Sequence, residues 1–356
     1  MASIMGICHN ALEELVIAEA EAQYKRLGAE AKTRIDLSEV IAYALNRLPT
    51  MYATTQRGWN QQRLKAHKEL GETIAKTLKN GFISTQRDSL RKLDPLPNHE
   101  VMTPSRALAK LQTILHRDQL KWAEVPDAVR QAIEQAVSPD GGKGTVYQNV
   151  ERRHALAVRT YATRRPNKTN SPEGPRSSLK FDPNDSHFSQ AAQEAREFST
   201  YMMGANYRYS NIMENLVLGI AERRLQRLTP DIAAQIQIED IVSYALNRLP
   251  PMYATSRRGM HQLREQVKAE MTNQVISVIK EAIAKVLQSP GRMIAPLPFD
   301  RFNMELNIAI EQLQTYFKDD QISWRNVGDY VEKAMLRSLY KRSYWQDDQD
   351  PPSFPG

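Results

Sequence analysis

Apolar side chains recur at helical spacing along most of the chain, which predicts a mainly α fold. Between residues 36 and 48 they follow the i, i+3, i+4, i+7 pattern of a core-facing helix, at Leu37, Val40, Ile41, Ala44, Leu45 and Leu48. A longer helix is predicted from apolar residues at steps of four, at Leu263, Val267, Met271, Val275 and Ile279. Two shorter helices are predicted at 106–116 and 125–136. Residues 51–54, by contrast, favour an extended backbone, so a small strand pairing is expected.

Polar residues mark where these helices begin and end. Asn10 stands at an N-cap position with Glu13 three residues later, which predicts a reciprocal capping box. Asp36 opens the helix of residues 36–48, and Pro49 ends it because proline disfavours helical backbone in the residue before it. Gly58 predicts a turn ahead of the long helix that follows.

The whole pattern occurs twice, about 200 residues apart. Residues 43–54 recur as residues 244–255, with Thr50 replaced by Pro251 as the one difference. Adding 201 also converts Asn10 into Asn211, and the correspondence extends over about 10–136 and 211–338. Self-similarity over this length indicates a duplicated domain. We therefore predict one repeat at 1–137, a linker at 138–200, a second repeat at 201–345 and a disordered tail at 346–356.

The predicted linker carries much of the positive charge. The chain of 356 residues has a formal net charge of +7, and residues 138–187 hold nine Lys or Arg against five Asp or Glu. This stretch is also rich in Gly, Pro, Ser and Asn, a composition that buries too little apolar surface to fold alone. A solvated connector is the favoured interpretation, with residues 150–163 compatible with a short basic helix. Attraction of nucleic acid or an acidic partner is the alternative.

Composition argues against several classes of protein. Cys8 is the single cysteine, which excludes an internal disulfide and a multi-cysteine zinc site. No two of the seven histidines are spaced as ligands on one helix face, and no Walker or dinucleotide glycine motif occurs, so we predict no catalytic residue and no cofactor. No apolar run approaches the roughly 20 residues of a membrane span, and the N-terminus does not resemble a signal peptide. We expect a cytoplasmic protein without a membrane partner.

The duplicated segment also holds the polar residues most in need of explanation. In the first copy these are Asn46, Arg47, Tyr52, Thr54, Thr55 and Arg57. In the second copy they are Asn247, Arg248, Tyr253, Thr255, Ser256 and Arg258. One interpretation is structural, since Arg and Asn suit a helix C-terminus and Thr or Ser caps a helix start. The other is a ligand site, since hydroxyl groups and a helix N-terminus bind phosphate, Arg pairs with guanine, and Tyr stacks on a base.

The same segment resembles the signature of the ComFB family of late competence proteins. The resemblance rests on residues 245–259, Ala-Leu-Asn-Arg-Leu-Pro-Pro-Met-Tyr-Ala-Thr-Ser-Arg-Arg-Gly, on their counterpart at 44–58, and on the helix start Asn-Ile-Met-Glu-Asn-Leu-Val at 211–217. It covers about 10–80 and 211–281. It implies small helical domains that dimerise and, in cyanobacterial members, a receptor for cyclic dinucleotides, cyclic di-GMP foremost.

Two departures from the family pattern matter. Some members hold zinc through cysteines between the first helix and the signature, but residues 28–42 contain none, so no metal is predicted. Thr50 replaces the second proline of the signature in the first copy, which predicts an altered or weaker site there.

Cyclic di-GMP is two-fold symmetric, so two equivalent half-sites across a pseudo-two-fold axis would match it. We therefore predict a non-enzymatic sensor whose repeats pair within one chain, or between chains as a homodimer, and act on a downstream protein. The four arginines would contact guanine or phosphate, the Thr and Ser residues phosphate, and the tyrosines a base. The alternatives are a protein-interaction scaffold without nucleotide binding and a nucleic-acid binder that uses the linker.

Overall fold

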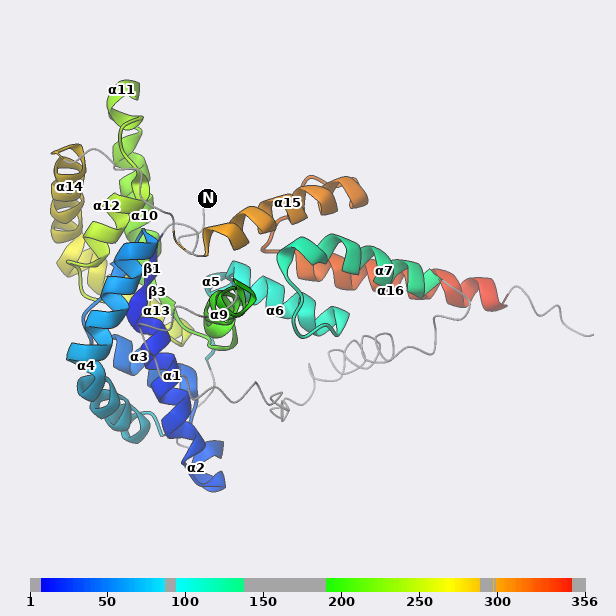
Figure 1. Cartoon of the computed structure of the whole chain (residues 1–356), viewed down its shortest axis with the longest axis horizontal. Coiled ribbons are helices and arrows are strands. Elements are labelled where there is room, and N and C mark those ends of the chain that lie inside the picture. Colours follow the sequence, from blue (N-terminus) through cyan, green and yellow to red (C-terminus); the bar gives the residue numbers. More distant parts are fainter. Residues whose placement is uncertain (1–7, 87–93, 138–189, 289–296, 298, 348–356) are drawn as a thin grey trace, which may run out of the picture. The chain divides into compact units, whose positions relative to one another are not determined.

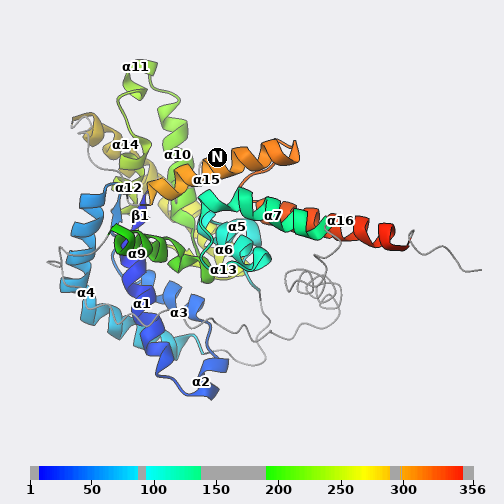
Figure 2. The same cartoon turned by 45° about the vertical axis from the view of Figure 1, so that its right-hand side comes forward.

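A computed structural model describes residues 8–86, 94–137, 190–288, 297 and 299–347 (Figures 1 and 2). These residues are mainly α-helical, as the sequence predicts. The chain divides into two compact units, one of residues 1–106 and 199–304 and the other of residues 107–198 and 305–356. Within the described ranges, each helix is too short or too polar to cross a bilayer.

The first repeat has three main helices and one strand pair. Its elements are β1 (His9–Asn10), α1 (Ala11–Lys25), α2 (Ala29–Thr33), α3 (Leu37–Leu45), β2 (Tyr52–Ala53) and α4 (Gln56–Ser84). The strands β1 and β2 run antiparallel, with His9 opposite Ala53 and Asn10 opposite Tyr52. α1, α3 and α4 pack on one another and bury Val40, Ile41, Ala44 and Leu45 of the stripe predicted for α3, whereas Leu37 is half-buried.

The second repeat has the same order of elements. They are β3 (Ser210–Asn211), α10 (Ile212–Leu225), α11 (Pro230–Ala233), α12 (Ile238–Leu246), β4 (Tyr253–Ala254), α13 (Arg257–Gln266) and α14 (Thr272–Gln288). A π-helical turn, Val267–Met271, joins α13 to α14, so this pair replaces the single long helix α4. The register of β3 and β4 equals that of β1 and β2 with 201 added.

The remaining helices follow each repeat. They are α5 (Asn98–Val101), α6 (Pro104–Leu115), α7 (Val125–Val137), α9 (Gln190–Met203), α15 (Asp300–Phe317) and α16 (Val327–Asp347). α6 and α7 match the two short helices predicted at 106–116 and 125–136. In the second unit α7 packs against α16, and Lys110 pairs with Asp329. α9 occupies the last part of the predicted linker, whereas residues 138–189 and the tail from residue 348 lie outside the described ranges.

Two local predictions were wrong. Asn10 caps α1 by accepting from the Leu12 N–H, but Glu13 does not complete a capping box; its carboxylate accepts from the hydroxyl of Tyr253 instead. Gly58 lies inside the first turn of α4, because Thr55 caps the helix by accepting from the Gly58 N–H at 3.1 Å. A Cβ at Gly58 would approach the Thr55 hydroxyl to 3.0 Å, which explains the glycine without a turn.

The two repeats lie in the same compact unit and contact each other there. β2 contacts α12, and β4 contacts α3, so each repeat presents its short strand to the other's central helix. Tyr52 of the first repeat belongs to the same buried cluster as Val242, Ala245 and Leu249 of the second. Equivalent surfaces that contact each other in this way are the mark of a two-fold arrangement.

Candidate functional site

Two asparagines clamp the backbone of the opposite repeat. Asn46, the C-cap of α3, donates from Nδ2 to the Tyr253 carbonyl at 2.9 Å and accepts from the Tyr253 N–H at 2.7 Å. Asn247, the C-cap of α12, makes the same two bonds with Tyr52 at 2.9 and 2.7 Å. Because a side-chain amide has one donor end and one acceptor end, each clamp satisfies two backbone groups of a buried tyrosine.

The tyrosine hydroxyls meet two carboxylates at the same contact. Tyr52 donates to Glu214 of α10 at 2.5 Å, and Tyr253 donates to Glu13 of α1 at 2.6 Å. Burial by the surrounding protein raises the pKa of Glu214 to about 8, with the negative charge of Glu13 as a second cause. Burial likewise raises the pKa of Glu13. The sequence prediction assigned Glu13 to a capping box and missed this role, although the same residue type recurs at the equivalent position of the second repeat, Glu214.

Further hydrogen bonds cross this contact, and those of Thr50 and Ser243 have no equivalent in the other repeat. Thr50 donates to the Leu246 carbonyl at 2.8 Å, a bond that Pro251 at the equivalent position cannot return. Ser243 donates to the Tyr52 carbonyl at 3.2 Å, where the other repeat has Ala42. Thr54 donates to Asp240 at 3.0 Å. The contact is therefore two-fold in its main features and asymmetric in detail.

Two arginines just beyond α3 and α12 are exposed. The guanidinium carbon of Arg47 lies 3.5 Å from the ring centre of Tyr43, and that of Arg248 lies 3.4 Å from the ring centre of Tyr244. Each guanidinium also donates to the carbonyl of the same tyrosine, at 3.1 and 3.3 Å. Among the described residues, neither arginine forms an ion pair with a carboxylate. Each is thus a positive charge held in a fixed orientation at the surface.

The other predicted residues lie at the starts of α4 and α13. Ser256 caps α13 by accepting from Gly259 at 3.1 Å, as Thr55 caps α4. Arg57 and Arg258 are exposed in the first turns of these helices, and Thr255 is half-buried. These residues form a second group, separate in sequence from the asparagine clamps and the arginine–tyrosine stacks.

An acidic residue of the chain itself covers the start of α13. The Asp94 carboxylate accepts from the Arg258 N–H at 2.8 Å, and its backbone carbonyl accepts from the Arg257 N–H at 3.1 Å. In the same helix, Arg264 donates from Nη2 to both carboxylate oxygens of Glu100, at 3.0 and 2.9 Å. The residue 201 positions after Asp94 is Ala295, which has no carboxylate to offer. The two helix starts are therefore chemically unequal.

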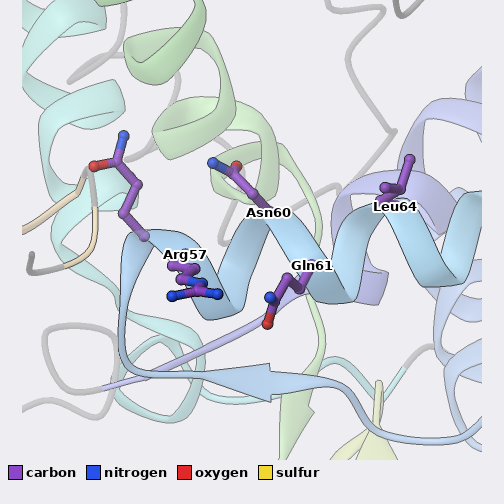
Figure 3. A pocket seen from close by; sticks show the side chains of 5 residues that line it. Arg57, Asn60, Gln61 and Leu64 are labelled. Atoms are coloured by element: carbon purple, nitrogen blue, oxygen red, sulfur yellow. The ribbon is translucent and has the colours of Figure 1, made fainter. Parts of the chain in front are cut away.

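The start of α4 borders an open hollow of about 430 Å³. Its lining side chains lie along the first turns of α4, as Figure 3 shows, and are Gln56, Arg57, Asn60, Gln61 and Leu64. The second repeat has Arg257 and His261 where the first has Gln56 and Asn60. The lining includes amide and guanidinium side chains, but most of the surface exposed in the hollow is apolar.

Metal and thiol chemistry find little support in the described part of the chain. It contains no group of three or more His, Cys, Asp or Glu side chains placed to hold a metal ion. Cys8 is buried, and this burial raises the pKa of its thiol well above the ordinary value, which keeps it protonated at neutral pH.

Comparison with known proteins identifies the repeats. The model of the family "Late competence development protein ComFB" matches the chain twice, at residues 9–89 and 210–290. These ranges enclose β1 to α4 and β3 to α14, the two sets of equivalent elements. No curated protein and no solved structure matches the chain. The chain is therefore a tandem ComFB-domain protein.

Proposed function

We propose that this protein is a non-enzymatic receptor for a cyclic dinucleotide, with cyclic di-GMP as the first ligand to test. One observation carries the proposal: the exposed arginine–tyrosine stack occurs in both domains, as Arg47 on Tyr43 and Arg248 on Tyr244. Both arginines are exposed, so each stack leaves guanidinium N–H groups at the surface.

The chemistry of the stacks suits such a ligand. Arginine pairs bidentately with the O6 and N7 atoms of guanine and also binds phosphate. A guanidinium that already rests on a ring loses less conformational entropy when it binds. Cyclic di-GMP has two guanines and two phosphates related by two-fold symmetry, so a pair of equivalent arginines matches both its charge and its symmetry.

The other predicted contacts take different places in this proposal. Hydroxyl and guanidinium groups for phosphate come from the segment at the start of each helix. In the first domain they belong to Thr54, Thr55 and Arg57, and in the second to Thr255, Ser256 and Arg258. Ligand contacts by Asn46, Asn247, Tyr52 or Tyr253 stay predictions. Such contacts would have to replace the bonds that these residues make between the domains.

Calorimetric titration of the full chain with cyclic di-GMP tests the proposal, with cyclic di-AMP and GMP as comparison ligands. Arg47→Ala and Arg248→Ala should each weaken binding at least tenfold, since a hydrogen bond to a charged group contributes about 1.5–3 kcal/mol. Arg223→Ala is the matched control. Arg223 makes the same kind of bond, from Nε to the Gly219 carbonyl at 2.8 Å. It is not part of the proposed site.

Each outcome has a defined meaning. Unchanged affinity in both arginine variants would remove the stacks from the site while leaving a receptor elsewhere on the chain. No binding of any cyclic dinucleotide would refute the receptor proposal and favour an interaction scaffold. A nucleic-acid binder that works through the linker predicts affinity that falls steeply with salt and is lost when residues 138–187 are deleted.

A further inference from the structure

The contact between the two ComFB domains brings together two carboxyl groups that belong to equivalent positions. Glu13 and Glu214 are half-buried, and each accepts a hydrogen bond from a tyrosine of the other domain, at 2.6 and 2.5 Å. The tyrosines are almost completely buried, with 2% of Tyr52 and 3% of Tyr253 exposed. Both carboxyl groups therefore lie in a poorly solvated place at the contact between the domains, close enough for the negative charge of Glu13 to add to the effect of burial in raising the pKa of Glu214.

The groups that face the pair from the strands and the segments before them are neutral or acidic. Tyr52 comes from β2, Tyr253 from β4, and Tyr209, which precedes β3, donates to Glu13 at 3.4 Å. Cys8, which precedes β1, is buried near Glu214 and Glu239, both of which raise the pKa of its thiol. Asn10 and Asn211 donate to the hydroxyls of Tyr253 and Tyr52, which orients these hydroxyls toward the carboxylates.

Cations do not balance this pair. Arg106 of α6 is the basic group that acts on the cluster, through its charge on Tyr209, and its guanidinium donates to the Tyr207 carbonyl. Within the described residues, neither Glu13 nor Glu214 forms an ion pair. Two carboxylates that share such a place cannot both ionise at neutral pH without strong repulsion, so one retains a proton.

We propose that Glu13 and Glu214 share one proton across the domain interface, and that the contact between the two ComFB domains weakens when this proton is lost. The tyrosine hydroxyls donate to either protonation state, so they hold the first negative charge. The second charge has no partner and repels the first. This inference concerns the pairing of the domains and does not depend on any nucleotide.

The direction of the pH dependence follows from the raised pKa values. A free glutamate has a pKa of 4.5, whereas that of Glu214 in the paired domains is about 8. Below pH 4.5 the glutamate is protonated in the separated domains as well as in the paired domains, so the contact has its full stability. Between 4.5 and about 8 separated domains release a proton that paired domains keep, so each pH unit lowers the pairing equilibrium by up to about tenfold. Above about 8 the loss is complete.

Carbon-13 NMR of glutamate carboxyl groups in the full chain measures the proton directly. One carboxyl signal should remain in the protonated position at pH 7 and titrate near pH 8. Glu214→Gln should remove that behaviour and let Glu13 titrate at lower pH, because the neighbouring charge is gone. If the wild-type spectrum shows every glutamate ionised by pH 6, the proposal is wrong, and this result does not require any variant to fold.

Hydrogen exchange at the Tyr52 and Tyr253 amides measures the pairing, since both amides donate to asparagines of the other domain. After correction for the intrinsic effect of pH on exchange, wild-type protection should fall by up to about tenfold per unit between pH 6 and 8. The double variant Glu13→Gln, Glu214→Gln should show no such fall. Glu281→Gln, at an exposed carboxylate on α14, is the matched control and should behave as wild type. Equal pH dependence in wild type and double variant would overturn the proposal.

Discussion

Replacement of the two clamp asparagines by alanine should destabilise the protein unequally. Asn46→Ala removes the partner of both the N–H and the carbonyl of Tyr253, and no other side chain in the described part of the chain donates to that carbonyl. Asn247→Ala also removes two bonds, but the Tyr52 carbonyl keeps its bond from Ser243. The first variant therefore leaves two buried backbone groups without a partner, and the second leaves one.

The expected magnitudes follow from this difference. A buried polar group left without a partner costs about 1–3 kcal/mol. Asn247→Ala should therefore lower the free energy of unfolding by about 1–3 kcal/mol, and Asn46→Ala by about 2–6 kcal/mol. The repeats supply the internal comparison, because the removed side chain and its two bonds are the same in both variants.

Urea denaturation followed by circular dichroism measures both changes. Asn60→Ala is the control, since Asn60 is an exposed residue of α4 and its replacement should change stability by no more than about 0.5 kcal/mol. Equal losses in the two clamp variants would refute the role assigned to Ser243. Losses no larger than that of the control would show that the clamps do not hold the domains together.

Three further predictions concern other parts of the chain. In α4, Gly58→Ala should lower the free energy of unfolding by about 1 kcal/mol, because the added Cβ disturbs the Thr55 cap. Gly71→Ala should raise it by about 0.5–1 kcal/mol, because nothing lies within 4 Å of the Cβ added there and alanine favours a helix. Thermal denaturation compares the two variants. Asp94→Ala should lower the free energy of unfolding by about 0.5–2 kcal/mol, because the Arg258 N–H in the first turn of α13 loses its acceptor, and Asp94→Asn should recover most of this loss. Equal melting temperatures for the two variants would contradict this role of Asp94. Wild-type unfolding free energy should fall more steeply between pH 5 and 8 than that of Glu214→Gln, since the raised pKa of Glu214 makes the native state hold a proton there.

The sequence by itself determined the duplication, most of the helices and some of their boundaries. These depend on neighbours within a few residues, as in the apolar spacing of α3 and the caps at Asp36 and Thr55. The end of α3 was predicted less well, because the helix ends at Leu45, before the predicted stop at Pro49. The ComFB signature likewise lies in one continuous segment. Local interactions of this kind are written in the order of the residues, so a sequence pattern can reveal them.

The tertiary structure alone decided which groups meet across the two domains. Asn46 and Tyr253 are 207 residues apart, and their local sequence does not indicate that the Asn46 amide binds the backbone of Tyr253 in the other domain. Glu13 has the spacing of a capping residue, yet its carboxylate lies against a tyrosine hydroxyl of the second domain. Asp94 likewise covers α13 across 164 residues. Such contacts depend on how two folded surfaces fit, and that geometry emerges only when both domains are built.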